Sequence, residues 1–146
     1  MKTIKGPAVY LAQFMDTKAP FNSLDGLCQW AADLGYKGIQ IPTWESALID
    51  LKKAGESKTY CDELKGKVES YGLAITELCT HLQGQLVAVH PAYDIMFDNF
   101  APDEYKGNPK ARTQWAIEQL KSAAKASRNF GLDVHGTFSG SLLWHT

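Results

Sequence analysis

The sequence predicts an α/β fold of four parallel βα units that form the N-terminal half of an eight-stranded barrel. A helix-period segment, a glycine and an apolar strand-like run follow one another three times, at Leu34-Gly35-Tyr36, Tyr71-Gly72-Leu73 and Phe130-Gly131-Leu132. One more strand-like run precedes the first helix. Strands that alternate with helices form βαβ units, a parallel sheet and right-handed crossovers.

The strands are expected to be short and apolar, and the helices to have one apolar side that lies on the sheet. Strands are predicted at residues 8–14, 37–41, 73–79 and 132–138. The first helix is expected to begin after Ser23, since serine is a good N-cap residue. Its apolar positions recur at helical spacing, at Leu24, Leu27, Cys28, Ala31 and Leu34.

Two further long helices follow from the same reasoning. The second has apolar residues at helical spacing from Cys61 to Tyr71, and the third begins at Asn108-Pro109, a cap residue followed by a proline in the first helical position. The glycine after each helix is a C′ residue, where the backbone turns left-handed. A short additional helix is expected around residues 45–54.

The connections differ strongly in length on the two sides of the predicted sheet. Links from helix to strand take about two residues, whereas the links from strand to helix cover residues 15–22, 42–57 and 80–108. In a parallel α/β fold, all strand-to-helix links emerge at the carboxyl ends of the strands, which is the side that binds ligands. The 29-residue link at 80–108 is therefore expected to be functional.

Four strands favour half of a barrel over an open sheet. An open sheet would leave two edge strands with unpaired backbone groups, and the chain has about half the typical ~250 residues of an eight-stranded α/β barrel. The apolar run Leu142-Leu143-Trp144 follows the fourth strand without a closing helix. We therefore expect residues 1–146 to be a partial barrel domain, truncated after strand four, or a half-barrel that needs a partner.

Alternation along the strands predicts a polar layer on one face of the sheet, formed by Gln13, Gln40, Glu77 and His135. The same alternation puts Ile75 on the side of Glu77. Buried polar groups need partners, and Glu77 and His135 on adjacent strands could pair. Such a layer is either an internal hydrogen-bonded network or a catalytic pair.

Five residues near the carboxyl ends of the strands are candidate substrate-binding residues. His81 ends the third strand, and a neutral imidazole there can ligate a metal, bind a hydroxyl group or move a proton. Gln83 offers amide donors and acceptors for a polyol, and His90 is followed by a proline that fixes an extended backbone. Trp44 and Trp144 follow strands two and four, where aromatic rings can stack on a sugar. Capping or packing is the alternative role for each of them.

The composition excludes several classes of protein. The formal net charge is -1, from 15 Lys and Arg against 16 Asp and Glu, which argues against a nucleic-acid partner or a basic membrane surface. No apolar run approaches the ~18 residues of a membrane span. Three cysteines without zinc spacing indicate reduced thiols and a cytoplasmic location. The common nucleotide, zinc-protease, hydrolase and calcium motifs are absent, and no metal ligands or catalytic residues can be assigned.

Two segments carry a resemblance to a known family. The run from Leu34 to Pro42 resembles the helix-one and strand-two signature of the sugar phosphate isomerase/epimerase (xylose isomerase-like TIM barrel) superfamily. The segment from Glu77 to Asp94 resembles the strand-three loop of one bacterial branch, and Thr137-Phe138-Ser139-Gly140 is similar to that branch as well. The resemblance covers the whole chain, but only the N-terminal half of a family member.

The resemblance implies a TIM (β/α)8 barrel enzyme that interconverts aldoses and ketoses, or epimerises a carbon beside a carbonyl, by proton transfer through an enediolate. It implies a divalent metal (Mn²⁺, Mg²⁺, Co²⁺ or Zn²⁺) whose ligands come mostly from later strands, outside this chain. His81 matches a position where family members often place a site histidine. Gln40 departs from the family, because many members have glutamate there.

Three hypotheses follow. The first is the N-terminal portion of a metal-dependent sugar or sugar phosphate isomerase or epimerase, catalytically incomplete by itself. The second is a non-catalytic half-barrel or fragment that self-associates and so forms a homo-oligomer. The third is the AP endonuclease-like branch of the superfamily, which acts on abasic DNA, and the near-neutral charge of this chain disfavours it.

Overall fold

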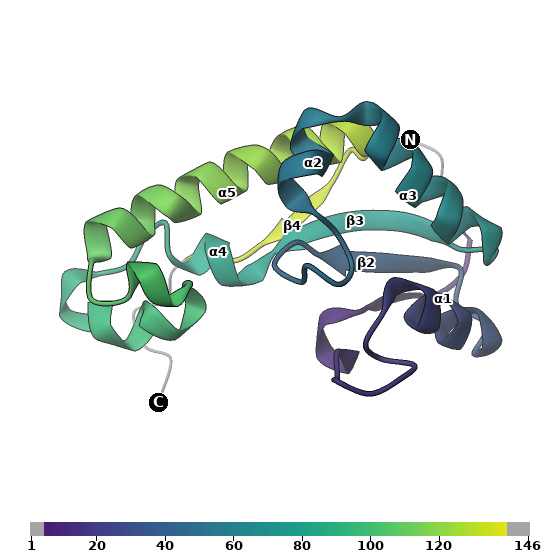
Figure 1. The fold of residues 1–146 in the computed structure, drawn as a ribbon, viewed down its shortest axis with the longest axis horizontal. Coiled ribbons are helices and arrows are strands. Elements are labelled where there is room, and N and C mark those ends of the chain that lie inside the picture. Colours follow the sequence, from purple (N-terminus) through teal and green to yellow (C-terminus); the bar gives the residue numbers. More distant parts are fainter. Residues whose placement is uncertain (1–4, 140–146) are drawn as a thin grey trace.

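One four-stranded parallel sheet organises the molecule. The computed structural model describes residues 5–139. The strands follow one another in sequence order across the sheet: β1 (Ala8–Tyr10), β2 (Gly38–Pro42), β3 (Ala74–Thr80) and β4 (His135–Thr137). Every neighbouring pair is parallel, with helices between consecutive strands (Figure 1). The predicted fold class, four parallel βα units of a half TIM barrel, is confirmed.

The helices are α1 (Leu24–Asp33), α2 (Leu51–Glu56), α3 (Lys58–Ser70), α4 (His81–Gln85) and α5 (Pro109–Phe130). α1 and α5 begin at the predicted caps, where the side chains of Ser23 and Asn108 accept hydrogen bonds from backbone N–H groups. α3 begins directly after Ser57, where the predicted link at residues 42–57 ends, and the hydroxyl group of Ser57 caps it by accepting from the N–H of Tyr60. The short helix expected around residues 45–54 is α2, which lies a little later.

The first and last strands are shorter than predicted. β1 ends at Tyr10, and a 3₁₀ helix, η1 (Ala12–Phe14), follows where the prediction extended the strand to residue 14. The turn brings the ring of Phe14 to 4.6 Å from that of Trp30 on α1, so the apolar residues of this run pack on a helix rather than on the sheet. Gln13 is exposed in η1 and takes no part in the predicted polar layer.

The sheet has one face covered by helices. Val9, Ile39 and Ile75 stand in register on β1, β2 and β3, and all three are buried. They belong to a core that also contains residues of α1, α2, α3 and α5, three of which (α2, α3 and α5) lie together along the sheet in Figure 1. Burial of this apolar surface is the main stabilising contribution to the fold.

A bulge in β3 changes which residues share a face. Ile39 pairs with Ile75, but the next residue of β2, Gln40, pairs with Glu77, so Thr76 is an extra residue. Its hydroxyl group donates a hydrogen bond to the carbonyl of Ile39. The predicted alternation that placed Ile75 beside Glu77 is therefore wrong. Gln40 and Glu77 lie on the face away from the main core, together with Tyr10, which is 55% exposed.

The long connection between β3 and α5 is folded rather than irregular. It contains α4 and two 3₁₀ helices, η2 (Pro91–Phe100) and η3 (Asp103–Tyr105). A second apolar cluster lies under it, built from Leu86, Phe97, Ala101 and Ala116, with partly buried aromatic residues around it. The connection thus has a small core of its own, which fixes it against the N-terminal half of α5.

The three cysteines are buried and free. Burial raises the pKa of Cys28 and Cys61 to about 11, and that of Cys79 to about 12. These thiols are therefore poor nucleophiles in the folded chain. Within residues 5–139, no helix has the length and apolar character that crossing a membrane requires.

Candidate functional site

Side chains from three strand ends meet at one edge of the sheet. Trp44 lies two residues after β2, His81 directly follows β3, and Phe138 directly follows β4. Since all strands are parallel, these positions are at the carboxyl edge, the side where α/β folds bind ligands. This edge is the candidate functional site.

Three rings form its surface. The imidazole of His81 stacks on the ring of Phe138, with centroids 4.1 Å apart and planes 9° apart. The indole of Trp44 lies 6.0 Å from the imidazole and is tilted by 40°. Phe138 approaches closely because residue 84 is a glycine, since a Cβ there would collide with the Phe138 carbonyl and the Thr137 hydroxyl group. The result is an apolar platform that includes one titratable group.

The imidazole of His81 is held neutral. Partial burial lowers its pKa below the usual value near 6.5, and the negative charge of Glu77 opposes this effect only in part. Among the described residues, neither ring nitrogen of His81 makes a hydrogen bond. A neutral imidazole with free nitrogens can accept a hydrogen bond from a ligand hydroxyl group or donate one to it.

A polar pair lies beside the rings on the same face of the sheet. The amide nitrogen Nε2 of Gln40 donates a hydrogen bond to Oε1 of Glu77 at 2.8 Å. Gln40 is buried, yet its Oε1 has no hydrogen-bond partner among the described residues. Glu77 is half-buried, so its carboxylate is fixed by Gln40 while it stays accessible.

The anticipated pairing of Glu77 with His135 does not occur. His135 is in register with Leu78, so it points to the helix-covered face, opposite to Glu77. Its Nε2 lies 2.9 Å from the hydroxyl oxygen of Thr80, and its Nδ1 lies 3.1 Å from that of Ser127 on α5. His135 is thus a hydrogen-bonded residue of the sheet–helix interface, because the register of β4 on β3 separates it from the polar pair.

Gln83 lies beneath the site rather than on its surface. It is buried, and its Nε2 donates a hydrogen bond to the hydroxyl oxygen of Thr43 at 3.2 Å. Thr43 in turn donates to the carbonyl of Cys79 at 2.9 Å, which ties the ends of β2 and β3 together. The Oε1 of Gln83 has no partner among the described residues. A contact of Gln83 with substrate stays a prediction.

The structure does not bring His90 to the rings. His90 is exposed in the long connection, where its Nδ1 accepts from the backbone N–H of Ala92 and caps η2. Its ring neighbour is Tyr93, at 5.8 Å. Trp144 lies outside the described residues.

Sequence reasoning missed Phe138 as a site residue, placed Gln40 in a polar layer and paired Glu77 with His135 instead of Gln40. Phe138 could have been found by the rule that selected Trp44 and His81, because it directly follows a strand. The Gln40–Glu77 contact could not, since it depends on the bulge at Thr76.

The candidate site lacks the ligand set of a metal centre among the described residues. No three His, Cys, Asp or Glu side chains gather closely enough to hold an ion within residues 5–139. The platform and the polar pair contribute one imidazole and one carboxylate, Glu77, with Oε1 already engaged by Gln40. The described residues therefore do not fit a metal site by themselves.

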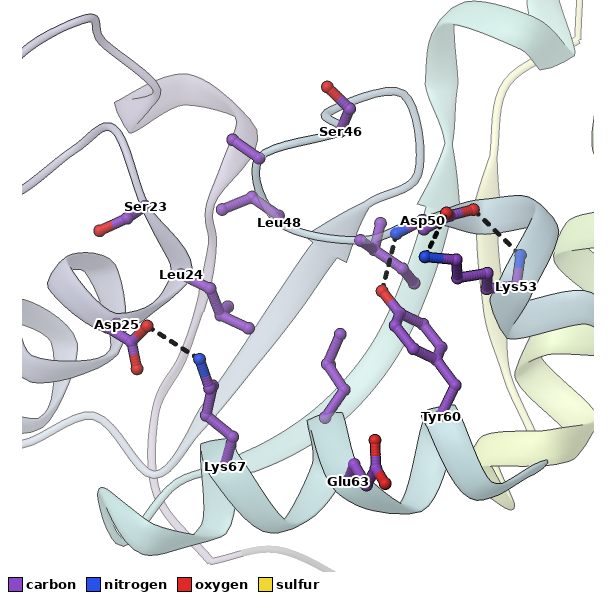
Figure 2. A pocket seen from close by; sticks show the side chains of 13 residues that line it. Ser23, Leu24, Asp25, Ser46, Leu48, Asp50, Lys53, Tyr60, Glu63 and Lys67 are labelled. Atoms are coloured by element: carbon purple, nitrogen blue, oxygen red, sulfur yellow. Dashed lines mark hydrogen bonds and ion pairs between the residues drawn. The ribbon is translucent and has the colours of Figure 1, made fainter. Parts of the chain in front are cut away.

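A cavity of about 540 Å³ lies elsewhere, between α1, α3 and the segment before α2 (Figure 2). Its two lysines are engaged: Lys67 pairs with Asp25 at 2.9 Å, and Lys53 with Asp50 at 3.5 Å. The hydroxyl oxygen of Tyr60 accepts from the N–H of Asp50. None of the predicted site residues lines this cavity, so the ring platform is the better candidate for chemistry.

The chain matches a model of a known protein family. The family model for the xylose isomerase-like TIM barrel matches residues 28–145, which is most of the chain. No curated protein matches the sequence.

Proposed function

Since this chain belongs to the xylose isomerase-like TIM barrel family, we propose that it binds a sugar or sugar phosphate at the platform of Trp44, His81 and Phe138, as part of an isomerase or epimerase. The family includes isomerases, epimerases and AP endonuclease-like members. Family membership therefore supports an enzyme, and the platform supports the sugar branch.

The observation that carries the proposal is the stack of His81 on Phe138, with Trp44 beside it. The C–H face of a pyranose or furanose is apolar and packs on aromatic rings, whereas its hydroxyl groups need polar partners at the edge. Here the polar partners are the neutral imidazole of His81 and the carboxylate of Glu77. A flat apolar surface with donors and acceptors beside it suits a carbohydrate better than a purely apolar ligand.

Each residue has a distinct part in this proposal. The rings of Trp44 and Phe138 exclude water and orient the sugar. His81 hydrogen-bonds a hydroxyl group through a free ring nitrogen, and Glu77 accepts from another. Gln40 holds Glu77 in place through the 2.8 Å hydrogen bond. Proton transfer through an enediolate is the reaction class proposed for the complete enzyme.

The chain alone is proposed to be catalytically incomplete. Residues 5–139 form four strands, and a (β/α)8 barrel has eight. The remaining strands, with the ligands of a divalent metal, would lie outside these residues. This accounts for the lack of a three-ligand cluster within the described part of the chain.

Sugar binding can be tested on the 146-residue chain by ligand-observed NMR with D-fructose, D-glucose and D-xylose. Wild type is expected to bind at least one of them, and His81→Ala and Trp44→Ala are each expected to weaken binding about 10-fold, since aromatic contacts contribute about 0.5–1.5 kcal/mol beyond burial. Ile95→Ala is the matched control, because Ile95 is 83% exposed on the long connection. No binding of any sugar, or equal losses in all three variants, would refute the proposal.

Binding to a DNA duplex that contains an abasic site tests the alternative function. Binding of this DNA with strong salt dependence, in the absence of sugar binding, would favour the AP endonuclease-like branch instead. The formal net charge of -1 leads us to expect no such binding.

A further inference from the structure

A threonine directly precedes each ring of the platform. The three pairs are Thr43-Trp44, Thr80-His81 and Thr137-Phe138. The hydroxyl group of Thr43 donates to the carbonyl of Cys79 at 2.9 Å, and that of Thr80 donates to the hydroxyl oxygen of Thr137 at 3.0 Å. Each of these bonds joins the backbone that leads into one ring to the strand end that leads into another.

Phe138 depends on the end of β4 for its position. It follows β4, a three-residue strand at the edge of the sheet, and it is 50% exposed. Short edge elements open locally at low cost. Thr80 and Thr137 are the last residues of β3 and β4 and stand in register. The hydrogen bond between their hydroxyl groups therefore fixes β4 at the point where Phe138 begins.

The hydroxyl group of Thr80 is oriented from its other side by His135. Thr80 is fully buried, and its hydroxyl oxygen lies 2.9 Å from Nε2 of His135. A hydroxyl group has one hydrogen, and that of Thr80 is donated to Thr137, so Nε2 of His135 is the donor to Thr80. Nδ1 of the same ring then accepts from the hydroxyl group of Ser127 at 3.1 Å. This chain of hydrogen bonds runs from α5 to the end of β4 and directs the Thr80 hydroxyl group toward Thr137.

We propose that Thr80 is a positioning residue whose hydroxyl group holds Phe138 stacked on His81 and so raises the affinity of the platform for a sugar. This inference rests on the proposed function. Thr80 acts through the stack and needs no contact with the sugar. A stack that is formed before binding spares the ligand the entropic cost of ordering the rings, and such preorganisation raises affinity. His135 contributes to the same arrangement, because it orients the Thr80 hydroxyl group.

The first test observes the stack without any sugar. The ring current of Phe138 should move the imidazole C–H signals of His81 upfield in proton–carbon NMR spectra, and Phe138→Leu defines their position without the stack. Thr80→Val removes the hydroxyl group but keeps the branched shape, and we expect it to lose most of the upfield shift. Thr80→Ser keeps the hydroxyl group and should keep the shift. A merely structural role of Thr80 would lower urea midpoints and leave this signature in both variants.

The second test measures affinity by ligand-observed NMR, for whichever of D-fructose, D-glucose and D-xylose binds wild type. Thr80→Val is expected to lose affinity about 5-fold, less than the removal of a ring, because the rings remain and only their arrangement is lost. Thr80→Ser should bind like wild type. Thr113→Val is the matched control, since the Thr113 hydroxyl group on α5 also donates to a carbonyl, that of Leu86 at 3.1 Å in the second apolar cluster. Its His81 signals and its affinity should equal those of wild type.

Thr137→Val keeps the inference testable if Thr80→Val does not fold. Thr137 is exposed, and its substitution removes the same hydrogen bond from the other side. Far-UV circular dichroism and urea midpoints report folding for every variant. An unchanged upfield shift or affinity in folded Thr80→Val or Thr137→Val, or loss of the shift in Thr80→Ser as well, would overturn this inference alone. No binding of any sugar to wild type would overturn the proposed function, whereas the His81 signals would still show whether the hydroxyl group positions the rings.

Discussion

Arg112 is the residue whose removal should destabilise the chain most clearly. Its side chain is fully buried on α5, and its guanidinium donates to the carbonyl and Oδ1 of Asp94, both at 2.7 Å, and to Oδ1 of Asp98. These three bonds hold η2, and with it the long connection that starts at the candidate site, against α5. The pKa of Asp98 is lowered, chiefly by the N–H of Gly107 and then by Arg112.

The cost of Arg112→Ala follows from these contacts. Hydrogen bonds that involve a charged group contribute about 1.5–3 kcal/mol each, so three of them give at least ~4.5 kcal/mol before the freed carboxylates are solvated. The carboxylates of Asp94 and Asp98 keep 27% and 16% exposure, so water will solvate them in part after the substitution. We therefore expect a loss of about 3 kcal/mol, the lower end of the range for breaking a buried ion pair.

Urea unfolding followed by circular dichroism measures this loss as a lower midpoint with an unchanged slope. In a chain of this size, the same loss lowers the melting temperature by roughly 10 °C. Lys121→Ala is the control, because Lys121 forms an exposed pair with Glu118, and its removal should change stability by less than about 0.5 kcal/mol. If Arg112→Ala were as stable as wild type within 1 kcal/mol or so, the buried pairs would not anchor the connection.

Three other predictions concern stability and reactivity. Burial lowers the pKa of His81 and of His135 below 6.5. As the pH falls below that value, the unfolded chain therefore binds more protons than the folded chain, and the free energy of unfolding should decrease. Urea midpoints at successive pH values measure this decrease, which should be smaller in His135→Gln. Ser57→Ala removes the cap of α3 and should cost about 1 kcal/mol in urea unfolding, whereas Ser70→Ala at the exposed end of the same helix should cost little; equal effects would argue against capping. The three buried cysteines should resist Ellman's reagent in the folded chain and react fully in urea, and rapid reaction without urea would contradict their burial.

The parts of the fold that follow from local signals were predictable from sequence. Ser23 and Asn108 are cap residues whose preference for helix starts is a local property, and both begin helices here. The β2 and β3 runs are apolar and bounded by glycine or polar residues, so their existence and parallel order were also predictable. His81 and Trp44 could be assigned to the site because residues that follow parallel strands lie at the ligand-binding edge of the sheet.

The parts that depend on long-range packing were not predictable. Phe14 reads as the end of a strand, yet it turns to pack on Trp30, which lies on another element. Because of the bulge at Thr76, the residues of β3 before it lie on the opposite face of the sheet from the one that simple alternation predicts. Nothing in the local sequence indicates this bulge. The register of β4 on β3 decides whether His135 meets Glu77, and register is a property of two strands together.

The strand order β1-β2-β3-β4 has a consequence for how the chain acquires its structure. Each strand joins only the one synthesised just before it, so a nascent polypeptide can complete one βα unit and then add the next without waiting for distant segments. Paired residues of neighbouring strands are still 30 to 57 positions apart in the sequence, so each addition has to close a loop of that length. The chain can nevertheless fold during synthesis by adding each new strand to the edge of the existing sheet. No late strand has to insert between two strands that are already paired.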